Sequence, residues 1–143
     1  MFCREQAARM NELVNEFDRA GVQIVGIGNG TPLMAQDFAS QFLIRFPLYT
    51  DPEKATYKHF GMKRLMGLSL GTMKRGWATY RKGFRQGSMQ GDAFQQGGVV
   101  LVEPSGNIIW SHIDEGPGMH AKPEQVRKAV KDYKWSITKS TTD

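Results

Sequence analysis

The sequence predicts one α/β domain, and the order of its helix-like and strand-like segments is the main reason. Helical and strand patterns alternate along the first half of the chain, and a β-hairpin followed by a helix closes it, as in an α/β sandwich. A chain of 143 residues is long enough for one domain with a sizeable core. An apolar content of 40% and a charged content of 23% are ordinary for a globular protein.

Neither a membrane span nor a secretory signal is visible in the sequence. No apolar run approaches the roughly 18 residues that would suggest a span. Charged residues follow directly on the first three residues, where a signal peptide would carry an apolar stretch. We therefore expect a cytoplasmic protein.

The first element is expected to be an amphipathic helix over residues 3–20, followed by a buried strand over residues 22–28. Apolar residues of the helix recur at three- and four-residue steps and therefore share one face: Ala7, Met10, Leu13, Val14 and Phe17. Gly21 stands where a glycine commonly ends a helix. The mostly apolar run that follows fits a strand that is covered on both faces.

Two further helices are predicted to begin at proline residues. Thr31 and Pro32 form an N-cap followed by a proline in the first turn, ahead of a short helix. A brief extended piece over 46–49 comes next. Asp51 and Pro52 then repeat the cap-plus-proline pattern and predict a second short helix.

Residues 61–98 have a different composition and are interpreted as a glycine-rich basic insertion, partly helical around 63–84 with a loop at 85–97. The stretch 63–85 contains seven basic residues and no acidic one, whereas the rest of the chain has 12 basic and 14 acidic residues. Contact with RNA, anionic lipid or an acidic partner is one interpretation of this stretch. A solvated insertion helix whose aromatic residues pack on the core is the favoured one.

The end of the chain predicts a hairpin and a last helix. Residues 99–103 and 107–113 are strand-like and flank a turn of proline, serine, glycine and asparagine. Pro123 opens the last helix, and the polar residues 136–143 are expected to be a fraying tail. The domain therefore covers residues 1–135, and its core strands lie at about 22–28, 99–103 and 107–113.

Four local sequences, in order, resemble the peroxiredoxin-like branch of the AhpC/TSA superfamily. Residues 2–7 resemble its active-site turn, and residues 91–99 its loop before the third core strand. Residues 46–52 and 103–108 match its short strand with capped helix and its hairpin. The resemblance covers residues 2–134 and implies a thioredoxin-like three-layer sandwich. It also implies an antioxidant-type oxidoreductase.

The chain departs from that pattern at its start, where the first core strand of the family is lacking. In the thioredoxin fold this strand lies between the strands that match 22–28 and 99–103. The chain is thus expected to be N-terminally truncated, or another chain fills the gap, or the sheet is rearranged. In the family's register Cys3 is the second position of a Cys-x-x-Cys motif. Gly98 stands where thioredoxins place a cis-proline.

Cys3 is the predicted catalytic residue, with Arg4 as electrostatic support. It is the only cysteine, so an internal disulfide is excluded. A helix N-terminus stabilises a thiolate and lowers the pKa of a cysteine below its ordinary value of about 8.5. The thiolate would attack a peroxide oxygen or a disulfide, and an external thiol of the thioredoxin or glutathione type would resolve the product. An inert cysteine is the alternative.

Other candidate sites are weaker. Gly26–Gly30 follows a strand but departs from the dinucleotide fingerprint, and a glycine-permitted turn is the favoured interpretation. The polar residues His112, Asp114, Glu115 and His120 lack the spacing of a known metal site and are expected at the surface. We therefore expect no cofactor, no metal and no nucleic-acid partner, with a homodimer as one arrangement. The alternative to an enzyme is a non-catalytic thioredoxin-fold module that binds through its sheet edge or its basic insertion.

Overall fold

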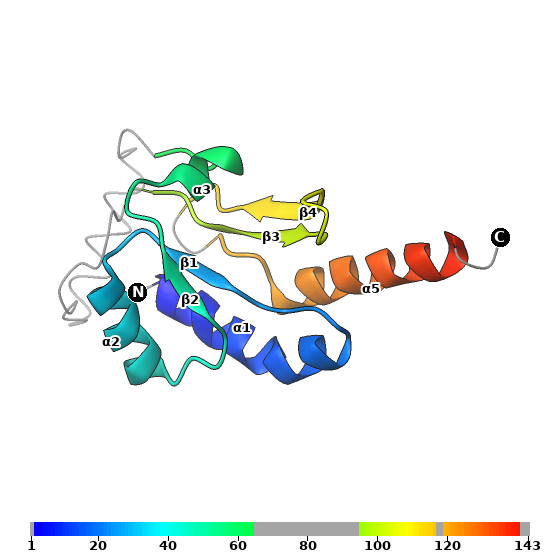
Figure 1. Cartoon of the computed structure of the whole chain (residues 1–143), viewed down its shortest axis with the longest axis horizontal. Helices are drawn as coiled ribbons and strands as arrows, with labels where there is room; N and C mark the ends of the chain where they lie inside the picture. The colour runs from blue at the N-terminus through cyan, green and yellow to red at the C-terminus, as the bar shows by residue number, and fades with distance from the viewer. Residues whose placement is uncertain (1, 65–94, 117–118, 141–143) are drawn as a thin grey trace.

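The computed structural model describes residues 2–64, 95–116 and 119–140 (Figure 1). Most of the predicted insertion, including its helix around 63–84 and its loop, lies outside these residues. The two ends of the insertion are described and meet. Arg64 and Gln95 form an antiparallel bridge, and the Gln96 amide donates to the Lys63 carbonyl oxygen at 3.0 Å.

Helices and strands alternate as the sequence predicts, which confirms the α/β class. The elements are, in chain order, α1 (Phe2–Arg19), β1 (Gly26–Gly28), α2 (Pro32–Phe42), β2 (Leu48–Thr50), α3 (Ala55–His59), β3 (Gly98–Val102), β4 (Ile108–Ile113) and α5 (Pro123–Ser140). The predicted strands 99–103 and 107–113 are confirmed to within one residue at each end. The predicted strand 22–28 is too long, because β2 pairs with only its last three residues.

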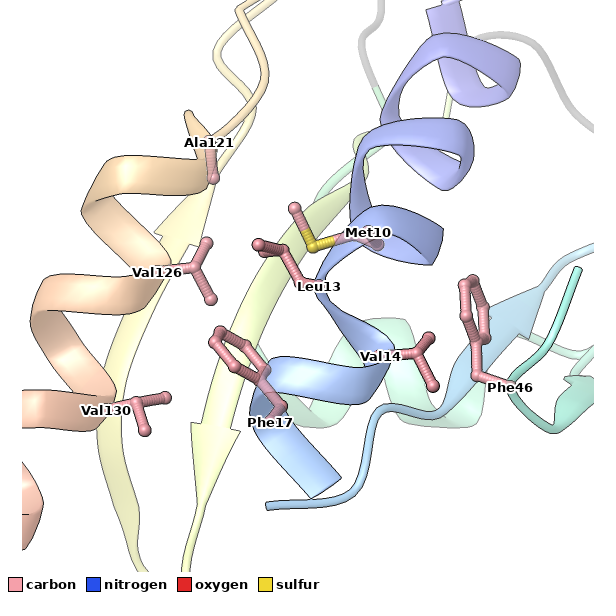
Figure 2. Packing of buried hydrophobic residues seen from close by; sticks show 8 residues of the cluster. All are labelled: Met10, Leu13, Val14, Phe17, Phe46, Ala121, Val126 and Val130. Carbon is pink, nitrogen blue, oxygen red and sulfur yellow. The ribbon is translucent and has the colours of Figure 1, made fainter. Parts of the chain in front are cut away.

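The core is built around α1. The predicted apolar face is buried at Met10, Leu13, Val14 and Phe17, and Leu13 is 1% exposed. Figure 2 shows the valines of α5 on one side of α1, facing Phe17, and Phe46 on the other side beside Val14. A single helix therefore supports both halves of the molecule.

The strands form two separate two-stranded sheets within the described residues. β1 pairs with β2 in parallel, and β3 pairs with β4 in antiparallel orientation. Both sheets pack against the α1 core. Leu48 approaches it from one sheet, as do Val22 and Ile24 from the segment before β1, and Val99, Leu101 and Trp110 approach it from the other sheet. Because the two sheets share this core, they lie in one domain.

The start of α2 agrees with the prediction, and the start of α3 does not. The Thr31 hydroxyl accepts from the Met34 amide at 3.4 Å, with Pro32 in the first turn. Asp51 does not open α3 directly, because residues 51–54 form a turn in which Lys54 has a φ of 60°. The Asp51 carboxylate instead accepts from the Thr56 amide at 2.7 Å, inside the helix. The helix therefore begins at Ala55, later than predicted.

The predicted fraying tail is wrong for residues 136–140, because α5 continues to Ser140. Hydroxyl groups on the exposed face satisfy helix carbonyls. Ser136 donates to the Tyr133 carbonyl at 2.7 Å, and Thr138 to the Lys134 carbonyl at 3.0 Å. Figure 1 shows the end of α5 extending beyond the rest of the fold. The helix therefore continues well beyond Val130, its last buried residue.

Glu103 joins the β3–β4 turn to α5. Its carboxylate accepts hydrogen bonds from the side-chain amide of Asn107 at 3.0 Å, from the Ser105 hydroxyl at 2.9 Å and from the Tyr133 hydroxyl. These hydrogen bonds, that of Asn107 first, hold the pKa of Glu103 below its ordinary value. Burial, together with the Glu103 carboxylate, raises the pKa of Tyr133.

We expect the Glu103→Gln variant to melt at a lower temperature than the wild type at neutral pH. In acid, we expect this difference in melting temperature to disappear. The folded-state pKa of Glu103 is lowered, so its stabilisation is present above the unfolded pKa and disappears as the pH falls through the folded one. Melting temperatures of both proteins between pH 7 and pH 3 test this. Glu53→Gln is the control, because Glu53 is exposed and makes no hydrogen bond within the described residues. A difference that persists unchanged into acid would contradict the assignment.

Candidate active site

Cys3 lies in the first turn of α1, which begins at Phe2. The first amide groups of a helix have no intrahelical acceptor, so this end attracts negative charge. The only acidic residue of the first turn is Glu5, and its carboxylate forms an ion pair with Arg9 one turn later. That ion pair offsets a negative charge that would oppose a thiolate nearby. The side chains of Cys3 and Arg4 lie outside the described part of the structure.

A cluster of two partly buried histidines and a buried aspartate links the end of β4 to the loop before α5. The His120 Nδ1 lies 2.6 Å from Asp114 Oδ2, and their side chains are 10% and 6% exposed. The His112 Nε2 lies 3.7 Å from Asp114 Oδ1 and 2.9 Å from the Met119 carbonyl oxygen. The Asp114 amide donates to the Gly97 carbonyl at 3.0 Å. The cluster thus fastens the β4–α5 loop to the start of β3.

The expectation that these polar residues lie at the surface is wrong for Asp114 and His120. The backbone bond from Asp114 continues the β3–β4 pairing past the end of β4 and draws the carboxylate inward. His112 and Asp114 share one face because side chains alternate along a strand. The spacing of His112 and Asp114 in the sequence was therefore the one signal that could have predicted that their side chains lie together. Glu115, on the other face, is exposed and takes no part.

The chemistry of this cluster is that of an oriented histidine. An ionised carboxylate only accepts hydrogen bonds, so an ionised Asp114 takes its hydrogen bond from His120 Nδ1, and this contact fixes the orientation of the ring. No three His, Cys, Asp or Glu side chains within the described residues are placed to hold a metal ion.

Gly26, the first residue of β1, is explained by packing. A Cβ atom at Gly26 would lie 2.3 Å from the Leu48 side chain and 3.0 Å from that of Phe46. The close approach of the Leu48 and Phe46 side chains to β1 therefore accounts for glycine at this position.

Within residues 2–64, 95–116 and 119–140, no helix combines the length and the apolar content needed to cross a bilayer.

Comparisons with known proteins place the chain in a redox family. The family model described as AhpC/TSA antioxidant enzyme matches residues 9–116, which begin after Cys3. The prostamide/prostaglandin F synthase of Sus scrofa is 33% identical over 137 residues, covering 91% of this chain and 67% of the relative. The enzyme of that name from Homo sapiens is 32% identical, covering 90% and 68%.

A third relative comes from a plant organelle. The chloroplastic thioredoxin-like protein AAED1 of Arabidopsis thaliana is 27% identical over 142 residues, covering 90% of this chain and 56% of the relative. These matches support a redox-related function and an oxidoreductase-like enzyme, and they agree with a thioredoxin-like fold. The extent of the family match shows that the chain belongs to the AhpC/TSA antioxidant enzyme family.

Proposed function

We propose that the protein is a thiol-dependent oxidoreductase that reduces a peroxide or a disulfide through Cys3. The observation that carries the proposal is the place of the only cysteine, in the first turn of α1, in a chain of a redox family. Unsatisfied amide groups and the positive end of the helix dipole favour a thiolate there. The ion pair of Glu5 with Arg9 supports the same conclusion.

The reaction with a peroxide balances with an external thiol as the reductant. The thiolate attacks one peroxide oxygen, a sulfur–oxygen bond forms, the oxygen–oxygen bond breaks, and the leaving oxygen takes a proton from solvent. The sulfur becomes a sulfenic acid. A thiol from another molecule condenses with it to a mixed disulfide and water, and a second thiol reduces that disulfide. The thiols must come from outside the chain or from a second copy of it, because Cys3 is the only cysteine.

The Cys3→Ser variant tests the proposal. We expect peroxide consumption with a dithiol reductant to fall to the rate of the reductant alone, because a hydroxyl replaces the nucleophile. The alkylation rate of the wild-type thiol against pH should give a pKa below about 8.5. The Arg9→Ala variant, which leaves Glu5 unpaired, should alkylate more slowly at neutral pH. Full activity in Cys3→Ser would overturn the proposal, as would an unreactive wild-type thiol.

A second candidate function is formation of prostaglandin F, the activity in the name of the relatives from Sus scrofa and Homo sapiens. An identity of 33% over 91% of the chain favours it as a candidate. Product analysis with wild-type protein and Cys3→Ser shows whether the protein forms prostaglandin F or reduces only simple peroxides. A protein inactive in all of these assays would instead be a non-catalytic binding module.

A further inference from the structure

The last helix, α5, has a buried first part and an exposed outer part. Ala129 and Val130 are buried in the core, whereas all side chains of residues 131–139 except that of Tyr133 are exposed. Figure 1 shows this outer part of the helix extending beyond the rest of the fold. It is therefore accessible to a surface outside the domain.

One face of the outer part combines an exposed tryptophan with lysines. Trp135 is 72% exposed, although tryptophan is a residue that usually buries most of its large side chain. Residues three and four apart share a face of a helix, so Lys131, Thr138 and Lys139 lie beside Trp135. Lys134 precedes it at the border of the same face. These five residues are called the Trp135 face below.

The positive charge of the Trp135 face is not neutralised within the described residues. Lys131, Lys134 and Lys139 form no ion pair there. Asp132 is the only acidic residue in the stretch 131–140, and it pairs with Lys128 at 2.6 Å. The Trp135 face is therefore complementary in charge to an anionic surface.

The shape of the face favours a group that belongs to a larger surface. An open hollow of about 350 Å³ is lined by Lys131, Asp132, Lys134, Trp135 and Thr138. All of these residues come from one helix, so the hollow does not enclose a free small molecule as an ordinary ligand site does. A phosphate group at the surface of a bilayer can enter it between the two lysines, while the tryptophan ring lies beside the headgroup.

We propose that the Trp135 face docks on an anionic lipid bilayer. Anionic headgroups attract lysine side chains, and tryptophan rings favour the boundary between headgroups and acyl chains. The helix would lie on the membrane rather than cross it. A nucleic-acid strand would find neither a groove nor a series of aromatic rings on this single helix. The proposal is independent of the chemistry proposed for Cys3.

Sedimentation of the whole chain with lipid vesicles tests the proposal. One set of vesicles contains phosphatidylcholine with about one-third phosphatidylserine, and the other contains phosphatidylcholine alone. We expect the protein to bind the anionic vesicles, with an affinity that falls steeply as salt is added. Tryptophan emission should shift to shorter wavelengths on binding. Equal binding to both kinds of vesicle would overturn the proposal.

A double lysine variant tests the charge of the face. Lys131→Gln with Lys139→Gln should bind anionic vesicles about thirtyfold more weakly, because each lysine near such a surface contributes about fivefold. Lys134 is kept, since its ammonium group lies close to Gly21 at the end of α1. The matched control is Lys58→Gln with Lys63→Gln, which removes the same charge from exposed positions elsewhere.

The control double variant should bind almost as tightly as the wild type. Equal losses in the two double variants would mean that net charge alone attracts the protein, and would overturn the proposal. Unchanged binding by the α5 double variant would also overturn it. Circular dichroism confirms that both variants keep the fold, which is expected because the four lysines are exposed.

Substitutions of Trp135 test the aromatic contact. Trp135→Ala should bind about tenfold more weakly, because alanine buries much less apolar surface. Trp135→Phe should still bind but lose most of the emission shift, which would locate the contact at this residue. Leu33→Ala is the control, because Leu33 is 67% exposed on α2, and it should bind as the wild type does. A full emission shift in Trp135→Phe, or full binding by Trp135→Ala, would contradict the proposal.

Two other occupants of the face are distinguished by the same experiments. Inorganic phosphate should release the protein from vesicles no better than sodium chloride of equal ionic strength. Stronger release by phosphate would assign the hollow to a free anion and overturn the proposal. Sedimentation without vesicles should give the same mass for wild type and Trp135→Ala. A lower mass for the variant would assign the face to a second copy of the chain, which would also overturn the proposal.

Discussion

The Leu13→Ala variant is expected to lose about 2.7–5 kcal/mol of unfolding free energy. Leu13 is 1% exposed and lies in the cluster that joins α1, α5 and both sheets. Removal of its side chain takes away buried apolar contacts and leaves a cavity that neighbours on two sides cannot both fill. Urea denaturation followed by circular dichroism gives the free energy directly.

Leu33→Ala is the matched control for this substitution. Leu33 is 67% exposed in the first turn of α2, so the same chemical change there should cost within about 0.5 kcal/mol, as for surface substitutions in general. Equal losses in the two variants would show that α1 is not the centre of the core. A loss near the upper limit is a large part of the 5–15 kcal/mol typical of a domain, so partial unfolding at room temperature is compatible with the prediction.

The Asp114→Ala variant is expected to lose about 1–3 kcal/mol, the usual cost of leaving a buried polar group without its hydrogen-bond partner. Asp114 is 5% exposed, and its carboxylate holds the His120 ring at 2.6 Å. Without it, a ring that is 10% exposed loses its acceptor in a site that water does not reach freely. Thermal and urea unfolding measure the loss.

Two further variants separate burial from charge at this position. Asp114→Asn keeps an oxygen acceptor of nearly the same size and should recover a substantial part of the stability. Asp132→Ala removes the partner of Lys128, an ion pair whose side chains are 61% and 75% exposed, and should cost about 0–1 kcal/mol. If Asp114→Ala cost no more than Asp132→Ala, the cluster would contribute no more than a surface pair.

The sequence was informative where periodicity and local caps decide the structure. The apolar face of α1 is buried as the spacing of Met10, Leu13 and Phe17 predicts, and Thr31 caps α2 as expected. Prediction failed where tertiary contacts or turns decide. The Asp51 carboxylate reaches Thr56 over an intervening turn. The strand predicted over 22–28 covers only its last three residues, because β2 pairs with these alone.

The candidate site was predictable in part. The position of Cys3 at a helix N-terminus follows from the helical pattern, and the structure places its backbone in the first turn of α1. The burial of Asp114 was not predicted, because it depends on a backbone bond to Gly97 from a distant part of the chain. Polar residues near a loop are usually exposed, so residue type alone predicts that Asp114 is exposed, which is wrong.

The bridge between Arg64 and Gln95 has a consequence for how this fold can change over time. It brings together the two ends of the segment 65–94, and the Lys63 amide adds a bond of 2.8 Å to the Gln96 side chain. When the ends of a segment are fixed side by side, the segment can be shortened, lengthened or exchanged with little change in the loop-closure entropy, and hence in the stability of the rest of the domain. Members of this lineage could therefore acquire new partners by replacing that segment while the helices and strands around α1 stay the same.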